Sequence, residues 1–143
     1  MSREAERIVG RARRLIGVRF RPQGRSAEHG LDCIGVVMMA TRLDPGRARR
    51  NYDMLATRDP QEVAAEFEAC GFIRLAPAQI EPGDILLVSV GPGHLHAAIL
   101  TPDGYLHADA RMRRVVEVPG AVPWPILSAW RVPEDGLAAV RLH

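Results

Sequence analysis

The sequence contains no lysine and only two cysteines among its 143 residues. All 19 basic residues are arginine, and the 17 acidic residues leave a formal net charge of +2. So small a charge does not indicate nucleic-acid binding, which depends on neutralising many phosphates. Arginine makes two-point contacts with carboxylates and phosphates, so the composition stays compatible with an anionic substrate.

The chain also lacks long apolar runs. None approaches the roughly 18 residues of a membrane-spanning helix, so no membrane span is predicted. The first residues, MSREAERIVG, are polar and lack the apolar core of a secretory signal. We therefore expect synthesis in a reducing cytoplasm, where Cys33 and Cys70 remain thiols. Action on a cell wall would then require lysis, a particle or an export machine.

Apolar residues make up 47% of the chain and charged residues 25%, which is typical of a folded globular protein. A chain of this length closes one hydrophobic core, so residues 1–143 are predicted to form a single domain.

Helical spacing of apolar residues, together with capping residues, predicts three helices in the first half of the chain. They are expected over residues 3–16, from Cys33 to about Leu43, and from the cap Asp59 to the stop at Gly71. The helix at Cys33 is apolar on nearly every side, which predicts a buried central helix. Residues 44–58 are predicted to be an irregular, arginine-rich loop.

After the third helix the pattern changes to strands separated by Gly, Pro and Asp turns. The strands are expected at 85–90, 95–100, 104–109, 113–118 and 128–132. Helices followed by an antiparallel meander predict an α+β fold.

Cys33 follows an aspartate and begins the apolar helix, which is a position suited to a nucleophile. The helix dipole and a neighbouring imidazolium would lower the pKa of such a thiol and increase its thiolate fraction. Taken alone, a cysteine among apolar residues more often packs in a core, so the interpretation depends on a base nearby.

Three histidines fall in the strand region: His94, His96 and His107. The turn TPDG joins the strands of His96 and His107, so pairing across it brings both to one sheet face. Alternation along the strand places His94 on the face of His96. These residues could provide a base and its orienting partner, a three-histidine zinc site, or simply half-exposed strand positions.

The segments LDCIGVV (31–37), PGDILLV (82–88), HAAIL (96–100) and GYLHAD (104–109) occur in an order that resembles the NlpC-type family of bacterial cell-wall cysteine peptidases. The resemblance covers about residues 5–118 and is strongest to the branch found in phage tails and gene-transfer particles. It implies a papain-like fold, in which N-terminal helices pack on an antiparallel sheet and the nucleophile begins a central helix.

The resemblance also implies roles for individual residues. Cys33 is expected to be the nucleophile, His96 the general base and His107 the residue that orients it. Asp32 matches an aspartate that helps to bind the free amine of a peptide stem, and Phe20 replaces a tyrosine placed beside the nucleophile.

Two further positions depart from the family pattern: Ile34 replaces a serine and Arg19 a proline. His94, which shares the expected face of His96, is a further candidate for substrate contact.

The predicted reaction is therefore hydrolysis of an amide in peptidoglycan stem peptides, at the bond between D-γ-glutamyl and the diamino acid, with no cofactor. Phage-tail or particle proteins are the other expected partners. Two alternatives remain: a metal-dependent hydrolase built on the histidines, and a non-catalytic particle component that retains the hydrolase fold.

Overall fold

We describe the fold from a computed structural model, which describes residues 1–43 and 59–137. The arginine-rich loop predicted at 44–58 lies outside the described residues. Within the described ranges, no helix combines the length and the apolar character needed to cross a bilayer.

The three predicted helices are present, and each begins at the residue that the sequence indicated. They are α1 (Arg3–Arg13), α2 (Cys33–Thr41) and α3 (Pro60–Ala69). A side-chain oxygen of Ser2, Asp32 or Asp59 accepts a backbone N–H of the following turn in each case.

Both α1 and α2 are shorter than predicted. After α1 the chain turns through Gly17, whose φ of 93° favours glycine and whose N–H donates to the carbonyl of Val115. The helix α2 ends at Arg42, which adopts a left-handed conformation with a φ of 58°. Tertiary contacts and cap conformation therefore set these ends, although helical periodicity continues beyond them.

Eight strands and one 3-10 turn, η2 (Pro77–Gln79), complete the described fold. The five predicted strands are observed as β4 (Ile85–Gly91), β5 (His94–Leu100), β6 (Gly104–Asp109), β7 (Arg114–Pro119) and β8 (Ile126–Arg131). Three short strands were not predicted: β1 (Arg25–Ser26), β2 (Gly30–Leu31) and β3 (Ile73–Arg74).

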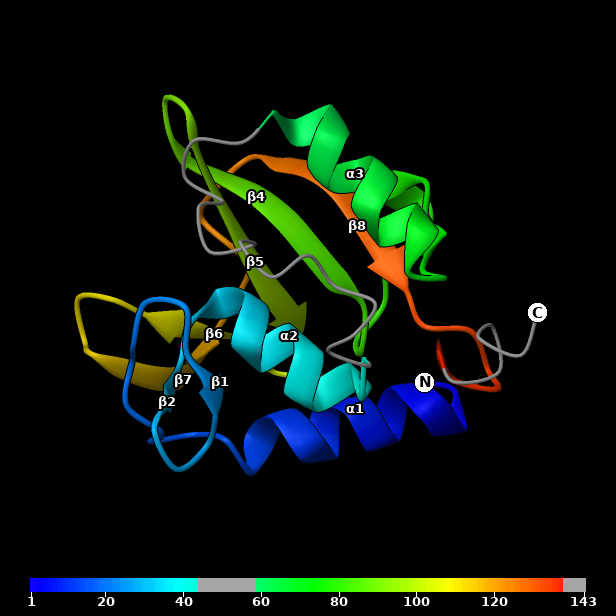
Figure 1. The fold of residues 1–143 in the computed structure, drawn as a ribbon. Coiled ribbons are helices and arrows are strands. Elements are labelled where there is room, and N and C mark those ends of the chain that lie inside the picture. The colour runs from blue at the N-terminus through cyan, green and yellow to red at the C-terminus, as the bar shows by residue number, and fades with distance from the viewer. Residues whose placement is uncertain (44–58, 138–143) are drawn as a thin grey trace.

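The larger sheet has the strand order β3-β8-β4-β5-β6-β7 and is antiparallel throughout (Figure 1). The meander from β4 to β7 follows the predicted order. The last strand departs from a meander because β8 crosses back to pair with β4 instead of continuing from β7. The pair β1–β2 forms a separate small hairpin just before α2.

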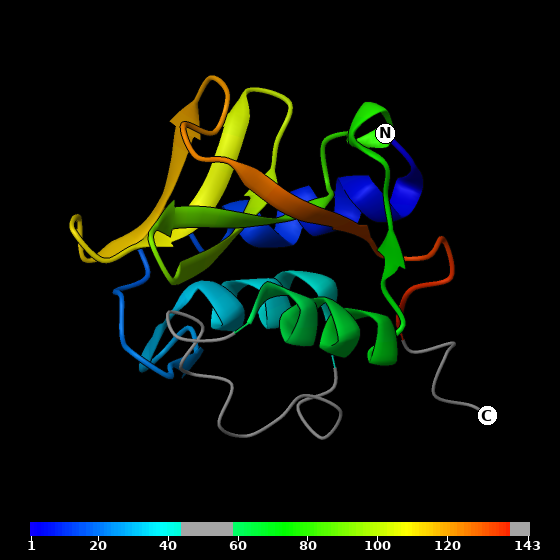
Figure 2. The same ribbon diagram turned by 90° about the horizontal axis from the view of Figure 1, so that it is seen from above.

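Two apolar layers hold the sheet. The helices α2 and α3 lie on one face (Figure 2), where Phe67 of α3 stacks on the buried Trp130 of β8. A smaller cluster on the opposite face is centred on Leu86, Val88 and Ala129. Burial of α2 between α1 and the sheet agrees with its nearly uniform apolar sequence.

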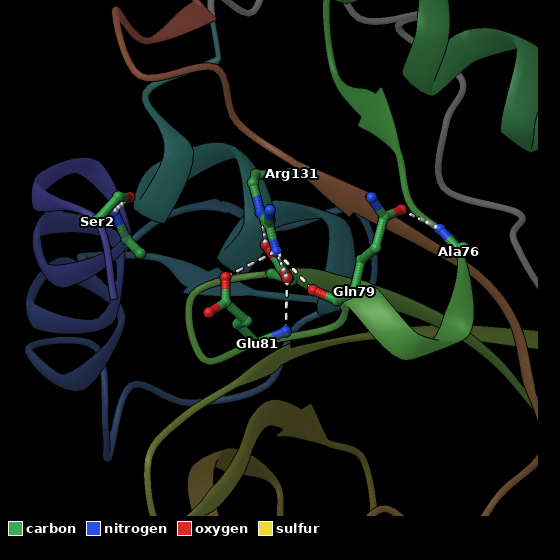
Figure 3. A network of polar contacts seen from close by, with 7 residues as sticks. Ser2, Ala76, Gln79, Glu81 and Arg131 are labelled. Atoms are coloured by element: carbon green, nitrogen blue, oxygen red, sulfur yellow. Dashed lines mark hydrogen bonds and ion pairs between the residues drawn. The ribbon is translucent and has the colours of Figure 1, made fainter.

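A polar network fixes the turn that leads into β4 (Figure 3). The Arg131 guanidinium donates to both carboxylate oxygens of Asp84, at 2.9 and 2.8 Å, and to the carbonyl of Gln79 at 2.8 Å. It also lies 3.2 Å from a carboxylate oxygen of Glu81. Asp84 is only 1% exposed, so the aspartate of the PGD segment anchors the fold instead of lining the candidate site.

Candidate active site

A cleft of about 330 Å³ lies between the start of α2 and the strands β5 and β6. Five of the residues singled out in the sequence line it: Phe20, Asp32, Cys33, His96 and His107. They come from four parts of the chain, namely the segment of Phe20, the start of α2, β5 and β6, so the fold brings the predicted nucleophile, base and orienting residue to one cavity.

Cys33 is the first residue of α2, and its side chain is partly exposed to the cleft. Backbone N–H groups of Ala97 and Ile34 lie close enough to the sulfur to favour the thiolate. Burial opposes them more strongly, and with the charge of Asp32 it raises the thiol pKa from 9.0 to about 12. The lowered pKa expected from the helix start is therefore wrong, and Cys33 rests as a neutral thiol.

Asp32 is the N-cap of α2, and both of its oxygens are occupied. Oδ1 accepts the Gly35 N–H at 2.8 Å and a hydrogen bond from the Arg25 guanidinium at 2.7 Å. Oδ2 accepts the Gln23 N–H at 3.0 Å. Burial raises the pKa of the Asp32 carboxyl, while the Gly35 N–H and the Arg25 charge counteract that rise.

Two glycines make this arrangement possible. A Cβ on Gly35 would overlap the carbonyl oxygen of Gly24, and a Cβ on Gly24 would overlap the carbonyl oxygen of Gly30. The segment carrying Gln23 and Arg25 therefore approaches α2 closely enough for both residues to reach Asp32. The sequence motif around Cys33 thus depends on glycines that permit close backbone contact.

His96 and His107 come from adjacent strands, as the turn between them indicated. Ile99 of β5 pairs with Leu106 of β6, which places the two histidines diagonally across the strands on one face. His96 Nε2 and His107 Nδ1 are 2.8 Å apart. Burial and then the neighbouring His107 lower the pKa of His96 to about 4, and burial also lowers the pKa of His107.

This geometry leaves His96 Nδ1 as the ring nitrogen not bonded to His107. Within residues 1–43 and 59–137, no hydrogen bond joins the Cys33 thiol to His96. Both groups are neutral at rest, so the thiol proton must move to His96 during the reaction itself. Catalytic contacts often tighten only when substrate is bound.

His94 does not join this group. It is exposed at the start of β5, where its Nδ1–H donates to the carbonyl of Pro92 at 2.8 Å, and it does not line the cleft. An irregularity between Ser89 and Gly91 interrupts the regular pairing of β4 with β5 beside it. In the part of the chain that the structure describes, no three His, Cys, Asp or Glu residues are placed to hold a metal ion, so the three-histidine zinc site is not formed.

The lining residues that were not predicted as site residues include two charged side chains and one aromatic side chain: Asp109, Arg111 and Trp124. Trp124 packs edge-on against both histidines, with ring centroids 5.8 Å from His96 and 5.6 Å from His107. It precedes β8, and the crossing of β8 to β4 could not be deduced from sequence spacing. Asp109, by contrast, lies two residues after His107 on one strand, so the period of two could have indicated it.

No protein-family model and no curated protein matches the chain. Its fold is similar to the NlpC/p60 domain of the peptidoglycan hydrolase SagA, with 24% identity, a TM-score of 0.54 and coverage of 80% of this chain and 88% of that one. The P60 domain of the M. avium subspecies paratuberculosis antigen MAP1204 is 16% identical, with a TM-score of 0.59, and the match covers 90% of this chain and 93% of that one.

The peptidoglycan hydrolase RipB from Mycobacterium tuberculosis is 21% identical, with a TM-score of 0.56, and the match covers 90% of this chain and 64% of that one. At these identities the likeness shows the fold. The expected α+β, papain-like NlpC-type fold, with N-terminal helices packed on an antiparallel sheet, is confirmed.

Proposed function

We propose that this protein is a cysteine hydrolase that cleaves an amide bond in peptidoglycan stem peptides. The observation that carries the proposal is the cleft in which Cys33, at the start of a buried helix, shares the wall with the hydrogen-bonded pair His96 and His107. Fold neighbours described as peptidoglycan hydrolases support the choice of substrate class.

In this mechanism the Cys33 thiol passes its proton to His96 Nδ1 as the sulfur attacks the substrate carbonyl carbon. The tetrahedral intermediate collapses, the C–N bond breaks, and His96 returns the proton to the leaving amine. Water then attacks the thioester carbon while His96 takes its proton. The C–S bond breaks, His96 returns that proton to the sulfur, and the acid product leaves. The two neutral resting groups suit this general-base route better than a preformed ion pair.

The start of α2 supplies a donor for the oxyanion. Asp32 Oδ1 accepts the Gly35 N–H, and the Ile34 N–H lies near the sulfur. The Cys33 N–H precedes both and points out of the helix end with the positive end of the helix dipole. In the proposed mechanism this N–H binds the carbonyl oxygen as its negative charge develops.

The bond between D-γ-glutamyl and the diamino acid is the proposed cleavage position. Action in a phage tail or gene-transfer particle, on the wall of a cell, is the proposed setting. The cleavage position rests on the sequence resemblance around Cys33 and the two histidines, and the setting rests on the resemblance to the phage-tail and particle branch of that family.

The test is mass spectrometry of defined muropeptides incubated with the wild type, Cys33→Ala and Cys70→Ala. Cys70 is the matched control because it caps the end of α3 and does not line the cleft. We expect the wild type and Cys70→Ala to release the same product pair and Cys33→Ala to release none. Cleavage by a folded Cys33→Ala variant would refute the mechanism, and an inactive wild type would favour the non-catalytic particle component.

A further inference from the structure

Asp109 ends β6 and faces the same side of the sheet as His107, two residues earlier. Its Oδ1 accepts the backbone N–H groups of Arg111 at 2.8 Å and Met112 at 3.2 Å, which fixes the carboxylate in the turn to β7. Its Oδ2 is directed to His107, 3.9 Å from Nε2. This separation exceeds a hydrogen bond but is short for the action of a charge on a buried ring.

The contact between the two histidines permits two proton arrangements. If His107 carries its proton on Nε2, its Nδ1 accepts from His96 Nε2–H, and His96 Nδ1 keeps a lone pair for the Cys33 proton. In the reverse arrangement His107 Nδ1–H donates to His96 Nε2, and His96 carries its proton on Nδ1. Only the first arrangement leaves His96 able to act as the base toward Cys33.

We propose that Asp109 is a positioning residue whose carboxylate holds the proton of His107 on Nε2 and thereby sets the tautomer of His96. The negative charge of Asp109 favours the tautomer of His107 in which Nε2 carries a hydrogen, because an N–H dipole and not a lone pair then points at Oδ2. The proton arrangement follows from this geometry alone, while its effect on hydrolysis rests on the proposed function.

The other charged and titratable groups around the pair do not duplicate this influence. The Cys33 thiol and the Asp32 carboxylate line the cleft from α2 and its cap, and the charge of Asp32 is paired with Arg25. The phenol of Tyr105 lies on β6, and the Arg111 cation lines the cleft. Among the described residues, Asp109 has the only carboxylate within ion-pair distance of either histidine. Its charge raises the pKa of both rings, against the effect of burial.

Asp109→Asn is a selective test because the amide keeps Oδ1 for the two turn N–H groups and replaces Oδ2 with a donor. That NH₂ group would donate to His107 Nε2 and reverse both tautomers. Nitrogen-15 NMR of the labelled histidines should show Nε2–H on His96 and His107 in the wild type, and Nδ1–H on both in Asp109→Asn. Asp103→Asn, an exposed aspartate in the β5–β6 turn, should retain the wild-type pattern. Unchanged tautomers in Asp109→Asn would overturn the proposal.

Kinetics on the muropeptide provide a second readout. A wrong tautomer in a comparable triad lowers kcat about 10⁴-fold, so we expect a loss of at least about 100-fold in Asp109→Asn with little change in KM. The acid limb of the kcat profile should also move to lower pH, because the charge that raises the pKa of His96 is gone. An unchanged kcat and acid limb would contradict the proposal.

If Asp109→Asn does not fold, Asp109→Ser carries the same test, since its hydroxyl can accept a turn N–H without charge or amide. This variant should show a mixture of tautomers, and the pure wild-type pattern would overturn the proposal. A wild type that shows the expected tautomers but cleaves no muropeptide would refute the proposed function and leave the role of Asp109 intact.

Discussion

Cys33 shows two opposing effects acting on one residue. The helix start stabilises a thiolate by about 0.3–1 kcal/mol, and up to about 2 kcal/mol in favourable geometry. A pKa that rises from 9.0 to about 12 corresponds to about 4 kcal/mol, an upper limit because the side chain is partly exposed. The effects of burial and of the adjacent Asp32 on the thiol pKa therefore outweigh the effect of the helix dipole, and Cys33 stays protonated until substrate arrives.

The raised pKa of Cys33 predicts how its reaction with a small neutral alkylating agent depends on pH. In a Cys70→Ala background, the alkylation rate by iodoacetamide should rise about tenfold per pH unit between pH 7 and pH 10, because the thiolate fraction rises at that rate well below the pKa. The measurement is mass spectrometry of the modified protein over time. A rate that is already constant above pH 7 would indicate a thiolate–imidazolium pair at rest and contradict this prediction.

At the scale of elements, α2 and the β1–β2 hairpin act as one unit. Residues 23–25, which lead into and begin the hairpin, bring the Gln23 N–H and the Arg25 side chain to the cap of α2. Gly24 in this segment approaches the helix only because Gly35 has no side chain. The position of Cys33 therefore depends on a contact between two backbones, in addition to the apolar packing of α2 on the sheet.

This contact predicts a large cost for Gly35→Ala. The added methyl group would overlap the Gly24 carbonyl, so the free energy of unfolding should fall by about 2–3 kcal/mol even though alanine favours a helix. Gly10→Ala in α1 is the matched control, because a Cβ there meets nothing within 4 Å. That variant should be neutral or up to about 1 kcal/mol more stable. Urea denaturation measures both changes, and equal effects would show that Gly35 makes no close contact in solution.

At the scale of the whole molecule, the partly buried His96 links folding to pH. In the unfolded chain His96 titrates near 6.5, but in the folded protein its pKa is about 4. Between these values the unfolded chain binds a proton that the folded protein does not, so stability falls as the pH falls. The contribution of neutral His96 to the free energy of unfolding is fully present above pH 6.5 and is lost progressively as the pH falls from 6.5 through 4.

We therefore expect the free energy of unfolding to decrease by up to about 3 kcal/mol through His96 as the pH is lowered from 6.5 to below 4. The measurement is denaturant unfolding at a series of pH values. His96→Gln should have a shallower slope in this window, whereas His94→Gln, which changes an exposed histidine, should keep the wild-type slope. Equal slopes in all three proteins would contradict the lowered pKa of His96 in the folded protein.

The sequence by itself determined the features that depend on neighbouring residues. Caps at Asp32 and Asp59 fixed where α2 and α3 begin, and the alternation of apolar residues located five strands. The pairing of His96 with His107 was also accessible, because a short turn joins their strands and a period of two assigns their face.

The tertiary structure decided what depends on distant residues. It placed β8 beside β4, bound Asp32 to Arg25, left His94 outside the cleft and raised the pKa of Cys33. Sheet order and desolvation arise from packing between segments far apart in the chain, so the local periodicity of the sequence does not predict them. The sequence therefore identified the candidate catalytic side chains, while the fold set their charge states and their hydrogen-bond partners.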